Sequence, residues 1–337
     1  SINRINIIKP MTNTIEKGSA SFEYLFDESP HIPGALKTFP IPGLSGAWSN
    51  GVNGLQFSEE MTPQGLAVSE KYIFVSAYDP TKTVNSVIYL IDQNKSELLK
   101  TIVIHNKAHL GGIYFDEEHQ ELWATGDWKH GESVTIFSME QFENYDIFDG
   151  QNLKPLKTFN LSSSPSSFLT VSGGQLFVGS FDVNKPGLVS VYRITRTENS
   201  TDLVNFSSKP YLDEPQEYLS NEQFVTIKQN QGLAINGSDL LMSSSYGPGK
   251  SILTRHHFNE SEYTNGKFVE LFPYLEQIVL QGRSSVYLLF EGGAKQYRKR
   301  SSRIIDRIIV ADLEQLFLGA KDYKRMPEIE WEYILYD

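Results

Sequence analysis

Residues 64–92, QGLAVSEKYIFVSAYDPTKTVNSVIYLID, decide the fold. They contain a short apolar strand, a tight turn, a second apolar strand ending in small residues, a loop and a third strand. Four further segments repeat this order, with first strands beginning near Gly111, Ser166, Gln231 and Ile278. Such a unit, recurring at roughly 45 to 65 residues, is typical of the blades of a β-propeller.

A fourth apolar strand lies between successive copies, at residues 98–104, 155–160, 223–227 and 267–272. The sequence therefore predicts an all-β propeller of five four-stranded blades, with short surface helices at 139–145 and 313–320. The fifth blade lacks an obvious outer strand, which either 52–57 or 330–335 would supply. If 21–60 form a blade of their own, the count is six. A β-sandwich also uses short alternating strands, but it gives this unit no reason to recur.

The domain organisation expected from these repeats is an N-terminal extension at 1–43 followed by one propeller domain at 44–337. The chain starts at Ser1 and has no apolar run long enough for a membrane span. Its polar opening fits the spacer left by a removed secretion signal or lipid anchor, or a trimmed end. A secreted protein without cysteine fits a Gram-positive exterior, so we expect a secreted or cell-surface monomer.

Composition and motifs exclude several classes of function. The net charge of −11 argues against a nucleic-acid partner. The absence of cysteine removes thiol nucleophiles and cysteine-ligated metals. The sequence has no zincin helix motif, serine nucleophile elbow or phosphate-binding glycine loop. Catalysis would therefore have to use carboxylates and imidazole.

The residues before each first strand and after each second strand are expected to meet at one end of the blade ring, because these strands are antiparallel. They supply amides, aromatic rings and lysines, a mixture typical of a ligand-binding pocket. The predicted ligand-binding residues are Gln64, Tyr78, Trp128, Lys129, Gln231, Tyr246 and Lys250. The rings would stack on a sugar or an amine, or pack between blades. The lysines would form a basic collar for an anionic polymer, or are solvated loop tips.

Glu291 is the most unusual residue at this end. The matching positions of the other repeats are read as Ala77, Gly126, Ser180 and Ser244, all of them small. We expect Glu291 to act as general acid or base with His109. It could also bind a metal such as Ca²⁺ together with Asp127 and Asp182. The alternative pairs Glu291 with Lys295 or Arg298 and gives the aspartates a turn-capping role.

The repeats Gln64-Gly65-Leu66 and Gln231-Gly232-Leu233, each followed by a strand ending in Ser-x-Tyr or Ser-Ser-Tyr, resemble those of secreted propellers with YVTN/NHL-type repeats. They are also similar to the five-bladed glutaminyl cyclases and the gluconolactonase-like propellers. The cyclase resemblance implies a catalytic Glu before a Gly-Leu strand, where this chain has Gln64, Gly111 and Gln231. The lactonase resemblance implies an axial divalent cation, for which the chain offers Asp127, Asp182, Asn230 and Glu291.

The function predicted from the sequence is binding of a small molecule or a cell-wall polymer at one mouth of the propeller channel. The alternative is a calcium-dependent hydrolase or lactonase that uses the same face. A third possibility is a protein-interaction scaffold that uses the blade sides or the basic loop at 295–303.

Overall fold

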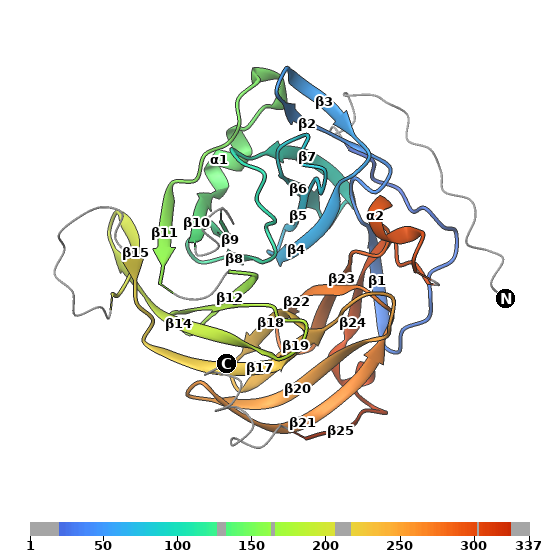
Figure 1. Cartoon of the computed structure of the whole chain (residues 1–337), viewed down its shortest axis with the longest axis vertical. Coiled ribbons are helices and arrows are strands. Elements are labelled where there is room, and N and C mark those ends of the chain that lie inside the picture. The colour runs from blue at the N-terminus through green and yellow to red at the C-terminus, as the bar shows by residue number, and fades with distance from the viewer. Residues whose placement is uncertain (1–19, 127–132, 163–165, 206–216, 302, 325–337) are drawn as a thin grey trace.

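The computed structural model describes residues 20–126, 133–162, 166–205, 217–301 and 303–324. Five sheets are arranged around a central axis, each packed against its neighbours (Figure 1). The predicted five-bladed β-propeller is confirmed. The first strands of the five blades contact one another in a ring and therefore line the axis.

The blades follow the chain in order. Blade one contains β4 (Thr62–Val68), β5 (Tyr72–Tyr78), β6 (Val87–Asp92) and β7 (Glu97–Val103). Blade two contains β8 (Ile113–Asp116), β9 (Glu121–Thr125), β10 (Ser133–Ser138) and β11 (Lys157–Leu161), beside which β16 (Glu217–Tyr218) lies parallel. Blade three contains β12 (Phe168–Ser172), β13 (Gln175–Gly179), β14 (Pro186–Thr197) and β17 (Glu222–Lys228), with β15 (Ser200–Leu203) also pairing with β14. Blade four contains β18 (Asn230–Asn236), β19 (Asp239–Ser244), β20 (Ser251–Asn259), β21 (Glu262–Leu271) and β25 (Lys321–Tyr323). Blade five contains β22 (Leu275–Gln281), β23 (Ser285–Phe290), β24 (Arg307–Asp312) and β1 (Ala35–Pro40).

The strand that closes the ring is β1, which pairs antiparallel with β24. The prediction that 52–57 would close it is wrong: Gly54–Ser58 forms β3, a hairpin with β2 (Ala47–Gly51). The other predicted segment, 330–335, lies outside the described residues. Pro40 at the end of β1 makes this strand hard to recognise in the sequence, because proline argues against a strand except at its ends or at the edge of a sheet. The propeller thus takes its closing strand from within 1–43, the stretch that the sequence assigned to an extension.

The apolar core lies between blades. One cluster joins blades two and three and contains Trp123, Phe159, Leu169 and Tyr192. A second joins blades three and four, and a third joins blades four and five. The inner strands of a blade therefore bury side chains on both faces, so the repeats appear in the sequence as apolar runs rather than strict alternations.

The described residues include four short helical segments: α1 (Met139–Asn144), the 3₁₀ turn η2 (Ile147–Asp149), α2 (Lys295–Arg298) and α3 (Leu313–Leu316). The predicted helices at 139–145 and 313–320 are present, the second one shorter than expected. Helix α1 begins with a capping box in which the Ser138 side chain accepts from the Gln141 backbone and the Gln141 side chain accepts from the Ser138 backbone. Within the described ranges, no helix has the length and apolar character needed to cross a membrane.

Candidate functional site

The start of each inner strand and the end of the strand beside it lie at the same end of the ring, as predicted. Thr62 pairs with Tyr78 in blade one, and Leu275 pairs with Phe290 in blade five. The register shifts between Pro63 and Gly65 in blade one and between Leu275 and Ile278 in blade five, so that Gln64 and Glu276 stand in β-bulges. A bulge re-aims a side chain relative to a regular strand. Here it brings groups from two blades together.

Glu276 and Glu291 form a buried carboxyl pair joined by a hydrogen bond. Their exposed fractions are 2% and 8%. Burial raises the pKa of both carboxyls, that of Glu291 to about 7 and that of Glu276 well above its usual range, where the Glu291 charge adds to the effect. At neutral pH Glu276 therefore keeps its proton and donates it toward Glu291, which loses its own proton as the pH rises through about 7.

Gln64 completes this pair from the neighbouring blade. Its Nε2 donates to Glu291 Oε2 and to the Pro63 carbonyl, the latter at 2.9 Å. No ion pair joins a cation to Glu276 or Glu291 among the described residues. Lys295 instead contacts Glu60 and Glu59 at 3.1 and 3.6 Å. The alternative in which Glu291 is an ordinary loop carboxylate paired with Lys295 is therefore wrong.

Two tyrosine hydroxyls lie beside the carboxyl pair. Tyr78 and Tyr297 hydrogen-bond to each other, and Gln296 Nε2 donates to the Tyr78 hydroxyl at 3.3 Å. Burial raises the pKa of Tyr78 to about 12, although the Gln296 hydrogen bond opposes the rise. Burial and the Glu291 charge also raise the pKa of Tyr297. Both phenols are therefore neutral hydrogen-bonding groups at physiological pH.

His109 contacts Tyr78 and not the carboxyl pair. The two ring centroids are 3.9 Å apart, and Lys82 Nζ lies 5.3 Å from the Tyr78 centroid. Desolvation, together with the Lys82 charge, lowers the pKa of His109 to about 4, although the residue as a whole is exposed to solvent. No hydrogen bond joins His109 to Glu291 in the part of the chain that the structure describes. Proton exchange between them would need a bridging group.

The other predicted ligand-binding residues that the structure describes have no hydrogen bond to the carboxyl pair. Gln231 Nε2 donates to the Ser245 carbonyl at 2.9 Å. The Tyr246 ring is 58% exposed and lies 6.3 Å from the ring of Phe181. Lys250 is exposed and forms an ion pair with Glu270 at 3.1 Å. Trp128 and Lys129 lie outside the described residues.

The predicted metal ligands are not gathered around Glu291 in what the structure describes. Asp182 caps its own turn by accepting from the Asn184 and Lys185 backbones at 2.8 and 3.0 Å, and Asp127 lies outside the described residues. No group of three His, Asp or Glu side chains in the described ranges could hold a metal ion. The Asn230 amide is 1% exposed and has no hydrogen-bond partner there.

Glu276 is one of the residues before a first strand that were expected at this end of the ring, but the sequence analysis did not single it out as a site residue. The pairings Pro63–Ala77, Asn230–Ser244 and Leu275–Phe290 place Glu276 level with Gln64 and Gln231. They also place Glu291 level with Tyr78 and Ser245, one residue later than the small residues used for the comparison. The carboxyl pair therefore consists of one glutamate in place of a repeated glutamine and one at the end of the second strand.

Gln277, which follows Glu276 in β22, links three blades through its side-chain amide. Its Oε1 accepts from the Leu66 and Ile113 backbone nitrogens at 2.7 and 3.0 Å, and its Nε2 donates to the Ile113 carbonyl at 2.5 Å. One side chain of blade five thus satisfies backbone groups of blades one and two. Gln277 is 2% exposed, so these hydrogen bonds between blades lie in the buried interior.

No protein-family model and no curated protein matches the sequence. Among solved structures, the chain is similar to hydrazine synthase of Kuenenia stuttgartiensis, with 10% identity and a TM-score of 0.40 over 93% of this chain and 86% of that chain. It is also similar to the WD40 propeller domain of Doa1, with 9% identity and a TM-score of 0.40 over 76% and 94% of the two chains. A functionally unknown protein from Desulfotomaculum acetoxidans gives 12% identity and 0.39 over 70% and 68%. These low values carry no functional argument, and the propeller assignment depends on the sheet topology.

Proposed function

We propose that this is an exported protein that binds a small polar ligand, or the end of a cell-wall polymer, through the carboxyl pair Glu276–Glu291. The observation that carries the proposal is that two glutamates are buried together with no cation beside them among the described residues. Burying ionisable groups in this way costs stability, and apolar side chains would serve the core better. Such groups mark functional sites more often than other positions.

The chemistry of the pair suits a ligand rich in hydroxyl or amino groups. With one proton between them, Glu276 and Glu291 provide both a donor and acceptors. The Gln64 amide and the Tyr78 and Tyr297 hydroxyls add neutral partners. Charged hydrogen bonds are the strong ones at such a site. The pair could also exchange a proton with a bound hydroxyl or amine, which would support acid–base chemistry.

We expect N-acetylglucosamine or ethanolamine, as probes of the two ligand classes, to bind the wild-type protein. Glu291→Gln is expected to weaken that binding by about tenfold or more, because it removes the charged acceptor. Titration calorimetry would measure both affinities. The matched control is Glu270→Gln, which removes an exposed carboxylate paired with Lys250 and should leave binding unchanged. Equal binding by the wild type and Glu291→Gln would contradict the proposal, as would no binding of either probe.

The calcium-dependent alternative has one observation in its favour. The buried Asn230 amide lacks a partner among the described residues, and Gly232 in the same strand lies against the Glu276 backbone. The Asn230 amide oxygen and the carboxylates of Glu276 and Glu291 would be suitable ligands for Ca²⁺. This alternative predicts that about 1 mM CaCl₂ raises the melting temperature and that Asn230→Ala abolishes the increase. An unchanged melting temperature in differential scanning fluorimetry would contradict it.

A further inference from the structure

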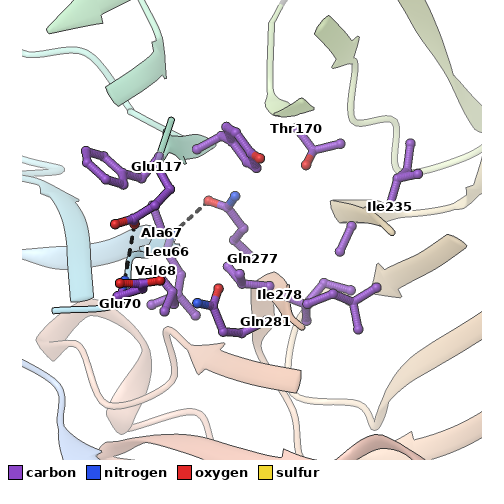
Figure 2. A pocket seen from close by; sticks show the side chains of 15 residues that line it. Leu66, Ala67, Val68, Glu70, Glu117, Thr170, Ile235, Gln277, Ile278 and Gln281 are labelled. Carbon is purple, nitrogen blue, oxygen red and sulfur yellow. Dashed lines mark hydrogen bonds between the residues drawn. The ribbon is translucent and has the colours of Figure 1, made fainter. Parts of the chain in front are cut away.

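A cavity lies at the other end of the inner strands, opposite the carboxyl pair. Its volume is about 190 Å³, the liquid volume of about six water molecules. Its lining combines apolar side chains of β4, β8, β18 and β22 with polar groups, among them Thr170 of β12, Gln277 and Gln281. Figure 2 shows the Gln277 amide at the centre, with Glu70 and Glu117 on one side and Thr170 and Ile235 on the other.

Gln277 makes this cavity independent of the site proposed above. Its amide is held by Leu66 and Ile113 and forms the inner boundary of the cavity. A ligand in the cavity would therefore contact neither Glu276 nor Glu291. Any binding here would be a second activity at the opposite end of the channel.

The charge at the rim of the cavity is one-sided. Glu70 and Glu117 are among the lining residues, which include no Lys, Arg or His. Glu117 is positioned by a hydrogen bond from the Glu70 backbone nitrogen at 3.2 Å. Neither carboxylate has an ion-pair partner in the described ranges. By contrast, Asp116 and Glu121 nearby are both paired with Arg196, at 2.6 and 3.0 Å.

We propose that this cavity binds a small organic cation, with an apolar body and a terminal ammonium group. The apolar walls would take the hydrocarbon part, since its removal from water is favourable. Glu70 and Glu117 would attract the ammonium, because low-dielectric walls focus the field of charges at a cleft. The partly buried Tyr114 ring in the lining adds an aromatic surface of the kind that attracts cations. The small volume of the cavity limits the ligand to few atoms.

Benzylammonium is the probe, and benzyl alcohol is its neutral isostere. We expect benzylammonium to bind about tenfold more tightly at low ionic strength, and this preference should shrink when salt is added. Chemical-shift changes in amide NMR spectra should map to Ile235, Gln281 and Glu117 rather than to Tyr78. Equal binding of the two probes would overturn the proposal, as would shift changes confined to the carboxyl-pair end.

Variants separate this inference from the proposed function. The double variant Glu70→Gln, Glu117→Gln is expected to weaken benzylammonium binding by about tenfold, because two partly exposed charges each contribute a few-fold. Glu118→Gln is the matched control, since this exposed neighbour does not line the cavity. Glu291→Gln should leave benzylammonium binding unchanged. If Glu291→Gln weakens it and the double variant does not, the cation binds at the carboxyl pair and the cavity proposal is wrong.

Discussion

Replacing both members of the carboxyl pair with glutamine should make the protein progressively more stable than the wild type as the pH rises from about 5 to about 8. In the unfolded chain the Glu291 carboxyl loses its proton near its ordinary pKa of 4.5, whereas in the folded protein it does so at about 7. Between these values the unfolded state has already released a proton that the folded state retains. Raising the pH therefore favours unfolding of the wild type.

The size of this effect follows from the shift in the pKa of Glu291. A change from 4.5 to about 7 corresponds to about 3 kcal/mol of unfolding free energy lost across that interval. Glu276 adds to this loss over the same interval and extends it to higher pH, because its pKa in the folded protein lies well above its ordinary value of 4.5. The double variant Glu276→Gln, Glu291→Gln removes both titrating carboxyls and replaces them with amides that can still form hydrogen bonds. Urea unfolding at a series of pH values would measure the growing difference between the two proteins.

His109 is the reason for using a difference rather than the wild-type curve alone. Its pKa is lowered from 6.5 to about 4, so the unfolded state binds a proton more readily than the folded state. That contribution has the opposite sign: stability is lost as the pH falls through this range. It is common to wild type and variant and cancels in the comparison. The control Glu118→Gln should differ from the wild type in its free energy of unfolding by a constant amount between pH 5 and 8. A constant difference for the double variant as well would show that the buried pair does not retain its proton.

The repeated strands could be predicted because each blade buries apolar side chains on both faces, which leaves a strong local pattern. The first and second strands of the first four copies are found close to the expected residues. The same repeats predicted that Gln64 and Glu291 lie at the same end of the ring, because antiparallel strands fix which strand ends are neighbours within each blade. These inferences depend on residues close together in one blade.

Features that depend on pairing between distant parts of the chain could not be predicted in this way. Strand β1 was missed because Ala35–Lys37 are largely exposed and only Phe39 and Pro40 are buried in it. The contact of Glu276 with Glu291 could not be predicted, because it depends on the bulge in β22, which shifts the register between Leu275 and Ile278. The role of Gln277 could not be predicted either, because its position in the sequence is that of any polar residue at the start of a strand. Its hydrogen bonds to blades one and two form only when the ring closes.

Gln277→Met is expected to destabilise the protein by about 4 kcal/mol, although it preserves the side-chain volume. It leaves two buried backbone N–H groups, those of Leu66 and Ile113, without their acceptor, and removes the donor to the Ile113 carbonyl. An unsatisfied buried polar group costs about 1 to 3 kcal/mol. Because these groups belong to two other blades, the loss would also weaken the contact between blade five and the start of the ring.

The matched control is Gln281→Met, at the far end of the same strand, where the side chain is only partly buried. Most surface substitutions change stability by less than about 0.5 kcal/mol, and chemical denaturation would measure both variants. A loss below about 1 kcal/mol for Gln277→Met would mean that water replaces the amide. In that case the Leu66 and Ile113 backbone groups would have solvent as their partner, and the Gln277 amide would not be needed to link the three blades.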